Sequence, residues 1–556
     1  MQHEIRLPDH AVIAAPSAYD YPLTIRQLLV NALAVNANQE VTYRGEKRYS
    51  YAGLQQRIGQ FASMLASLGV KAGTTVAVMD WDSHRYLESY FSIPMMGATL
   101  LTVNVRISPH QIAYTLNDSG AQVLVANAEF LPLLEQIWGS LVHPPLLIIA
   151  RDKDSDTPAP SSLPVAGDYE QRMSLASSEF VFEDFDERTR AALFYTTGTT
   201  GDPKGVAYSH RQIVLHTLAT ATALASPREG QRLHREDVYM PITPMFHVLA
   251  WGMPYVAVML GLKIVLPGRY LPDVLLRLRR TERVTFSHCV PTVLQMLIDE
   301  ARRDGQNMSG WKMMIGGSAL SQTLCRAAHD LGIDVFSGYG MSETGPVVAL
   351  SQFPPGVALP DVDENVRKRC MAGRPVPMVE LRVVDGEMRD VPQDGRTPGE
   401  IVLRAPFLTL GYHGKPEASE ALWAGGYLHT QDVAVMHPDG YIQIVDRIKD
   451  IIKTGGEWVS SIEIESFIAE VPGVQESAVI GVNDDKWGER PMALVVRRPG
   501  VAVTVTDVRD HLLALAAANR ISRYAVPEST RIVFIEEMPK TSVGKLDKKR
   551  LREWTG

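Results

Sequence analysis

Apolar and polar positions alternate along most of the chain with either a helical or an extended period. Apolar residues recur at helical spacing over residues 51–68, and Gly69 follows as a helix stop. Short apolar runs at 75–79, 122–126 and 146–150 predict buried strands. Because helical and strand patterns take turns along the chain, we expect an α/β architecture with largely parallel sheets.

The pattern changes near residue 446. Before it, residues 400–403 and 440–445 predict strands of a β-rich subdomain. After it come a short charged stretch at 447–450, which could act as a swivel, and a unit that reads as β, α, β, α, β. We therefore predict a large N-terminal domain over 1–446, with two α/β subdomains and the β-rich subdomain, and a small mobile α+β C-terminal domain over 447–556. Residues 151–167, rich in Asp, Ser and Pro, are predicted to form a surface loop within the large domain.

Composition indicates a globular protein with several structural units: 556 residues, 45% hydrophobic and 21% charged. The formal net charge of -8 gives no basic stripe for nucleic acid, so no nucleic-acid partner is expected. The three cysteines, Cys289, Cys325 and Cys370, form no CxxC pair, in keeping with a reducing compartment. The N-terminus lacks a signal-peptide pattern, and the longest apolar stretch, 251–267, contains Lys263 and falls short of a membrane span. We predict a cytoplasmic protein without a transmembrane segment.

A polar loop at residues 194–206 carries the first chemical indication, with the sequence FYTTGTTGDPKGV. Small residues let backbone N–H groups approach an anion, hydroxyls add donors and the lysine adds charge. The segment predicts a polyphosphate cradle formed by Thr196, Thr197, Gly198, Thr199, Thr200, Gly201 and Lys204. This loop is not a Walker loop, because Gly205 follows the lysine where a Walker loop has Ser or Thr. The later segment Gly338-x-Gly340 is not a dinucleotide-binding fingerprint, because Glu343 stands where the third glycine belongs.

This loop resembles the signature of the adenylate-forming superfamily, which comprises acyl-CoA synthetases, peptide-synthetase adenylation domains and firefly luciferase. Six further motifs of that superfamily follow in order: Phe246-His247, GGSAL at 316–320, GYGMSET at 338–344, HTQD at 429–432, the stretch 446–457, and PKTSVGK at 539–545. The resemblance covers nearly the whole chain. It implies an acyl-CoA synthetase that uses ATP, Mg²⁺ and coenzyme A, forming an acyl-adenylate and pyrophosphate, then acyl-CoA and AMP. The motifs look most like those of bacterial medium-chain fatty acid–CoA ligases.

The resemblance assigns roles around the nucleotide. Tyr339 stacks on adenine, Asp432 accepts hydrogen bonds from the ribose hydroxyls, and Arg447 contacts ribose and phosphates. A carboxylate suits a vicinal diol because both of its oxygens are acceptors. The other nucleotide-site residues are Gly317, Ser318, Ala319, Gly338, Gly340, Met341, Ser342 and Ile444. One departure is Gln431, which stands where the family usually has glycine, so the turn before Asp432 is left open.

The chemistry joins two anions, so the site must neutralise charge and hold the reactants in line. The resemblance gives Lys545 the role of stabilising the pentavalent transition state, Thr344 a contact with the α-phosphate, and Glu343 the Mg²⁺ ion. It places a hinge at Lys449, about which the C-terminal domain rotates between half-reactions. That rotation would bring up a face for coenzyme A made of Thr454, Gly455, Gly456 and Glu457.

The acyl pocket is predicted to involve His247, Val248, Trp251, Gly317 and Gly340. His247 corresponds to a residue between the ATP and acyl sites, and Trp251 is equally consistent with pocket lining or core. Acetate-activating relatives place a tryptophan at the position of Gly340, so glycine favours an acid longer than acetate or propionate.

Several alternatives stay open at this point. They are an aryl-CoA ligase, a ligase for a short substituted or branched acid, an enzyme that passes the adenylate to a carrier protein, an amino-acid adenylation domain, luciferase-like oxygenation and a non-catalytic nucleotide-binding protein. The sequence does not determine the oligomeric state, for which a homodimer is the family analogy, nor a peripheral association with membranes.

Overall fold

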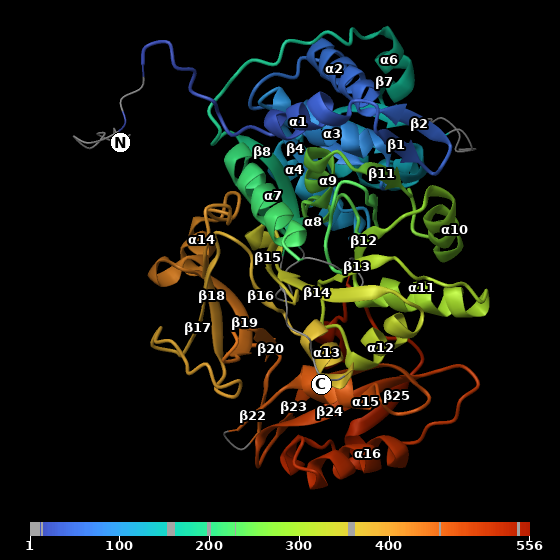
Figure 1. The fold of residues 1–556 in the computed structure, drawn as a ribbon, viewed down its shortest axis with the longest axis vertical. Helices are drawn as coiled ribbons and strands as arrows, with labels where there is room; N and C mark the ends of the chain where they lie inside the picture. The colour runs from blue at the N-terminus through green and yellow to red at the C-terminus, as the bar shows by residue number, and fades with distance from the viewer. Residues whose placement is uncertain are drawn as a thin grey trace.

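The computed structural model describes residues 12, 15–152, 162–196, 202–227, 230–353, 362–454, 457–541 and 545–555. Four β-sheets organise them, and Figure 1 shows the N-terminal part of the chain at the top and the C-terminal part at the bottom. No helix in these ranges is both long enough and apolar enough to cross a membrane.

The seven-stranded sheet confirms the predicted α/β pattern. It is parallel except at the β8–β9 hairpin. Its order is β7 (Val165–Asp168), β6 (Leu146–Ala150), β5 (Val123–Asn127), β3 (Thr75–Met79), β4 (Thr99–Thr102), β8 (Arg190–Thr196) and β9 (Lys204–Ser209). Its helices are α3 (His84–Met95), α4 (Pro109–Ser119), α5 (Leu131–Ile137) and α6 (Tyr169–Leu175). The loop predicted at 151–167 is wrong at its end, because residues 165–168 pair with β6 as an edge strand.

The nine-stranded sheet supplies much of the site. Its central strands are parallel, and antiparallel strands flank them at both edges. Its order is β16 (Arg374–Pro375), β15 (Val347–Leu350), β14 (Asp334–Gly340), β13 (Lys312–Ile315), β12 (Phe286–Cys289), β10 (Val238–Pro241), β11 (Lys263–Leu266), β1 (Glu40–Tyr43) and β2 (Lys47–Ser50). The helices of this part of the chain are α1 (Arg26–Asn36), α2 (Tyr51–Ser67), α7 (His210–Ala225), α8 (Val248–Trp251), α9 (Met253–Leu260), α10 (Pro272–Glu282), α11 (Pro291–Arg303), α12 (Gln322–Asp330) and α13 (Val362–Arg369).

Helix α2 illustrates why local sequence sets these elements. The Ser50 side chain accepts a hydrogen bond from the Gly53 N–H group and caps the first turn. The apolar face then buries Leu54, Ile58 and Phe61 among others, and the helix ends one residue before Gly69 at its C-cap, Leu68. The helix predicted at 51–68 is therefore confirmed.

Two smaller sheets complete the fold. An antiparallel sheet of β17 (Glu380–Val384), β18 (Gly399–Arg404), β19 (Leu428–Met436) and β20 (Ile442–Arg447) forms the β-rich part, with α14 (Pro416–Leu422) beside it. The last unit contains β21 (Ile452–Thr454), β22 (Glu457–Val459), β23 (Val474–Asp484), β24 (Gly488–Arg497) and β25 (Ile532–Ile535), with α15 (Ser461–Ile468), α16 (Val505–Ala517) and α17 (Lys548–Thr555). The β, α, β, α, β prediction for this unit is too simple, since two strand positions are hairpins and a third helix closes the chain.

Candidate active site

A cleft of about 940 Å³ opens where the nine-stranded sheet, the β-rich sheet and the C-terminal unit meet. Its wall includes residues that directly follow β13, the carboxyl end of β14 and the ends of β8 and β20. In open parallel sheets, ligands bind at the carboxyl ends of strands, so this placement is typical of a nucleotide site. Most of the residues expected around a nucleotide line this cleft, although they lie far apart in the sequence.

Two glycines after β13 let distant segments come close together. A Cβ atom on Gly316 would lie 2.8 Å from the carbonyl oxygen of Gly338 and 3.1 Å from the Trp251 ring. Gly317 has φ +79°, and a Cβ atom there would lie 3.3 Å from Cε of Lys545. The close approach at this turn therefore requires small residues. Ser318 and Ala319 continue the same wall of the cleft.

The expected ribose site is assembled from β14, β19 and β20. Asp432 is buried, and its carboxylate accepts hydrogen bonds from the Tyr339 hydroxyl at 2.8 Å and from Nε of Arg447 at 3.1 Å. A buried carboxylate held by an aromatic hydroxyl and a guanidinium is oriented without a ligand. The structure thus brings together three residues expected to contact adenine, ribose and phosphate.

The turn expected before Asp432 is wrong, because Gln431 lies inside strand β19, where the pairing with β18 is irregular. Gln431 takes φ +59°, the left-handed region that glycine adopts most readily. Its N–H group donates to Oε1 of Glu400 at 2.9 Å, and its carbonyl accepts the N–H group of Ile448 at 2.9 Å. The positive φ suits the glycine that the resemblance implies at this position, and the two hydrogen bonds hold glutamine in that conformation.

Glu343 and Lys204 both contact Tyr412 at the end of the cleft that is expected to hold the phosphates. Glu343 is buried, and its Oε1 accepts a hydrogen bond from the Tyr412 hydroxyl at 2.7 Å. Burial raises the pKa of Glu343, although Tyr412, Arg447 and Lys204 oppose that effect. Lys204 begins β9 opposite Thr196, and its Nζ lies 4.7 Å from the centre of the Tyr412 ring. Tyr412 was missed by sequence reasoning, because no local pattern relates it to a glutamate 69 residues earlier.

Lys545 reaches this cleft from the last segment of the chain. Burial, followed by the charge of Arg447, lowers the pKa of Lys545 to about 8. The carboxylates of Asp432 and Glu343 act in the opposite direction, so both lie near enough to interact with the ammonium group. A cation is therefore held in the same part of the cleft as the expected ribose and metal carboxylates, where it could meet negative phosphates.

Residues 30–413 match the AMP-binding enzyme family. The chain belongs to the AMP-binding enzyme family. Residues 463–545 match the C-terminal domain of AMP-binding enzymes, a segment that ends at Lys545.

Two similar proteins align with nearly the whole chain. It is 40% identical to a long-chain-fatty-acid–CoA ligase of Thermus thermophilus and 34% identical to a medium-chain-fatty-acid–CoA ligase of Ectopseudomonas oleovorans. The first alignment covers 96% of both chains, and the second covers 94% of this chain and 93% of the relative. A crystal structure of the anthranilate CoA ligase AuaEII in complex with anthranoyl-AMP superimposes with a TM-score of 0.84 at 25% identity, covering 96% of this chain and 98% of that one. This AMP-binding enzyme is therefore an acid–thiol ligase of the acyl-CoA synthetase class, with ATP and CoA as co-substrates.

Some expected site residues do not line the cleft of this AMP-binding enzyme. Thr344 is fully buried, and its hydroxyl is hydrogen-bonded to the backbone of Met341 and Pro346. The structure therefore does not place Thr344 for an α-phosphate contact, whereas Ser342, two residues earlier, lines the cleft. Ile444 packs against the main hydrophobic core and does not line the cleft either.

The expected coenzyme A face also lies away from the cleft. Thr454 is buried in β21, and Glu457 is exposed in β22, at the edge of the last sheet (Figure 1). Neither lines the cleft, whereas the predicted hinge residue Lys449 does. Seven predicted residues lie outside the described ranges: Thr197, Gly198, Thr199, Thr200, Gly201, Gly455 and Gly456.

The segment after His247 has an unusual backbone. Val248, Leu249, Ala250 and Trp251 have φ values of +46°, +53°, +46° and +59°, so α8 is a left-handed turn. Such a conformation costs about 1–2 kcal/mol for each non-glycine residue, so the surrounding structure must impose it. Trp251 is 5% exposed, lines the cleft and lies 5.1 Å from the His288 ring, which makes it both pocket lining and core.

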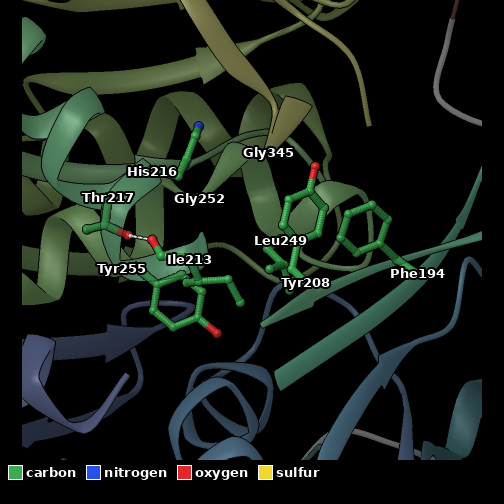
Figure 2. Close-up of a pocket in the computed structure, with 9 residues that line it drawn as sticks. All are labelled: Phe194, Tyr208, Ile213, His216, Thr217, Leu249, Gly252, Tyr255 and Gly345. Atoms are coloured by element: carbon green, nitrogen blue, oxygen red, sulfur yellow. Dashed lines mark hydrogen bonds between the residues drawn. The ribbon is translucent and has the colours of Figure 1, made fainter. Parts of the chain in front are cut away.

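Behind this turn lies an enclosed cavity of about 10 Å³, close to the minimum for one water molecule. Figure 2 shows its lining of Phe194, Tyr208, Ile213, His216, Thr217, Leu249, Gly252, Tyr255 and Gly345. The rings of Phe194 and Tyr208 are stacked with centres 5.7 Å apart, and the Thr217 hydroxyl donates to the Ile213 carbonyl at 2.7 Å. Since that hydroxyl is already satisfied, the cavity presents a largely apolar surface next to the left-handed turn.

Proposed function

We propose that this ligase activates an aliphatic carboxylic acid of medium or greater chain length as its acyl-adenylate and then forms the CoA thioester. The observation that carries the proposal is the position of Lys545, whose Cε approaches Gly317 inside the cleft while its pKa responds to the buried carboxylates of Asp432 and Glu343. This is the arrangement that adenylate formation requires, because a cation is held where two anions must meet.

In the first half-reaction, a carboxylate oxygen of the acid attacks the α-phosphorus of ATP. An oxygen–phosphorus bond forms, and the bond to the bridging oxygen breaks, so that pyrophosphate leaves. Lys545 stabilises the charge that develops on the α-phosphate, Asp432 and Arg447 hold the ribose, and Tyr339 packs on the adenine. Ser342, which faces the cleft, takes the phosphate contact that the sequence had suggested for Thr344.

Glu343 fits the role of holding Mg²⁺. Within the described ranges no group of three or more His, Cys, Asp or Glu side chains could hold a metal ion by itself. Mg²⁺ at nucleotide sites usually takes only one or two carboxylates and completes its shell with phosphate and water oxygens. Oε1 of Glu343 accepts the Tyr412 hydroxyl, which orients the carboxylate, and its oxygens are ligands of the kind that Mg²⁺ takes. When bound, Mg²⁺ neutralises phosphate charge and helps to hold the phosphates in line.

The second half-reaction needs a different face in the cleft. We propose that the chain divides into residues 1–446 and 447–556 and that the second part rotates about Lys449. Thr454 and Glu457 now lie away from the cleft, and a rotation that withdraws Lys545 could bring their strands to it. The thiolate of coenzyme A then attacks the acyl carbonyl, a carbon–sulfur bond forms and AMP leaves.

The acyl site is proposed next to Trp251 and the left-handed turn. Burial lowers the pKa of His247 to about 3, with Lys545 and Arg106 adding to the effect, so His247 is neutral near pH 7. A neutral imidazole and an indole suit an uncharged acyl chain better than a second carboxylate. The names of both fatty-acid ligase relatives support an aliphatic chain, and the likeness to an anthranilate ligase keeps an aromatic acid as the second candidate.

Gly340 gives weaker information about chain length than its sequence context suggests. A Cβ atom at this position would lie 1.7 Å from the carbonyl oxygen of Pro346. Glycine is therefore required by the close approach of two backbone segments, whatever the length of the pocket.

The substrate is tested by CoA- and ATP-dependent AMP release with a series of acids from acetate to palmitate, together with benzoate and cinnamate. We expect kcat/KM to rise from acetate to medium or longer aliphatic acids and to be low for the aromatic acids. Turnover with aromatic acids only would reject the aliphatic substrate, and AMP release without CoA would indicate that the second half-reaction uses another acceptor.

A further inference from the structure

A buried polar network lies at the junction between β20 and the C-terminal unit. Asp446, near the end of β20, is only 1% exposed. Its Oδ2 accepts hydrogen bonds from the N–H group of Ser461 at 2.7 Å and from the Ser461 hydroxyl. Its Oδ1 accepts the N–H group of Arg447 at 2.8 Å. All these donors converge on one carboxylate, which leaves it well satisfied without water.

Lys548 completes the network from the opposite end of the chain. Its Nζ donates to the Ser461 hydroxyl oxygen and lies 2.7 Å from Oε1 of Glu465. The same Glu465 oxygen accepts the N–H group of Val479 at 2.8 Å. Burial lowers the pKa of Lys548, but Glu465 and Asp446 more than offset this and raise it above its ordinary value. Lys548 therefore stays charged in the network, where its removal would leave the Glu465 carboxylate without its counter-charge.

The network limits where Lys545 can be. Lys548 begins α17 three residues after Lys545, and three residues span at most about 11 Å. Residues 545–547 are also paired with residues 539–541, because the N–H group of Thr541 donates to the Lys545 carbonyl at 2.7 Å and that of Asp547 to the Pro539 carbonyl at 2.9 Å. Fixing Lys548 beside Asp446 thus keeps Lys545 next to the end of β20 and the cleft.

Helix α17 makes a second contact beside the proposed hinge. Arg552, one helical turn beyond Lys548, pairs with Asp450 at 2.7 Å. If the C-terminal unit turns about Lys449, Asp446 stays with β20 while Ser461 and Lys548 move with the unit. The hydrogen bonds between Asp446 and Ser461 must then break, as must the one from the Ser460 hydroxyl to the Val445 carbonyl at 2.5 Å.

We propose that Asp446, Ser461 and Lys548 are positioning residues that hold Lys545 in the cleft for adenylate formation and separate before thioester formation. This inference rests on the proposed function and deepens it. It predicts that weakening the network impairs the first half-reaction selectively, because only that step uses the orientation of the C-terminal unit seen here.

The test compares Lys548→Met with Arg550→Met. Arg550 lies on the same helix but is exposed and does not line the cleft, so its substitution removes a charge without touching the network. The first half-reaction is followed by ATP–pyrophosphate exchange, and the second by CoA-dependent AMP release from supplied acyl-adenylate. We expect Lys548→Met to slow exchange by about tenfold or more, the effect of losing one charge-assisted hydrogen bond, and to change the second step by less than about twofold. Arg550→Met should change neither.

Ser461→Ala keeps the test informative if Lys548→Met does not fold, because it removes a single hydroxyl from the same network. An equal loss in both half-reactions, or unchanged exchange in a folded Lys548→Met or Ser461→Ala protein, would overturn the positioning role. Failure of the wild-type protein to exchange pyrophosphate with any acid would instead reject the proposed function itself.

Discussion

The backbone at Gln431 allows a stability change to be worked out from the structure. A non-glycine residue in the left-handed region costs about 1–2 kcal/mol, and Gln431 has φ +59°. Glycine avoids the cost of the left-handed conformation, but its larger loss of conformational freedom on folding costs about 0.5–1 kcal/mol more than for other residues. The Gln431 side chain is exposed, so little burial is lost. Gln431→Gly should therefore raise the free energy of unfolding by about 0.5–1 kcal/mol.

Urea unfolding of three variants checks this value. Gln431→Gly should unfold at higher urea than the wild type, and Gln431→Val at lower urea, because a β-branched residue tolerates positive φ poorly. Gln443→Gly is the matched control, since Gln443 is exposed in the regular strand β20 and its substitution should destabilise by about 0.5–1 kcal/mol. A Gln431→Gly protein as destabilised as Gln443→Gly would refute the reasoning, because position 431 would then behave as ordinary strand.

Three further predictions concern the cleft. With a pKa of about 8, Lys545 is protonated below pH 8 and neutral above it. The kcat/KM for pyrophosphate exchange should therefore fall about tenfold per pH unit above pH 8. Lys545→Arg should not show this fall, and a wild-type rate unchanged to pH 10 would contradict the prediction. Gly340→Ala should abolish exchange, because its Cβ meets the Pro346 carbonyl, and normal activity would show that the two backbone segments separate easily. Tyr412→Phe should raise the Mg²⁺ concentration needed for half-maximal exchange by about tenfold, because Glu343 loses one hydrogen bond to its carboxylate. Tyr427→Phe, which removes a similar bond to Glu380 on the surface, should not change that concentration. Equal effects of the two substitutions would count against a role of Glu343 at the metal.

The sequence predicts elements whose local signals agree. The strand at 75–79 is buried along its whole length, so its continuous apolar run suffices to identify it. Strand β7 was missed because none of its four residues is fully buried and it follows a stretch rich in Asp, Ser and Pro. In the C-terminal unit, β23 and β24 are joined by a short turn, and sequence patterning did not separate the two strands of this hairpin.

The prediction of the site from the sequence was limited in a different way. Its motif residues could be predicted because each lies in a short recognisable segment, and the structure brings Lys545, Asp432 and Tyr339 together. The phosphate contact was predicted for Thr344, because the sequence does not show that its hydroxyl is hydrogen-bonded to the backbone of Met341 and Pro346 while Ser342 lines the cleft. Contacts such as that of Tyr412 with Glu343 depend on tertiary packing and leave no local pattern.

The measurement that tests the account most directly is ATP–pyrophosphate exchange by Lys545→Ala with a fatty acid that the wild type activates, paired with CoA-dependent AMP release from supplied acyl-adenylate. The account predicts a loss of exchange of about a hundredfold or more with little change in the second step, because Lys545 acts only in forming the adenylate. Exchange close to the wild-type rate, or an equal loss in both steps, would contradict it.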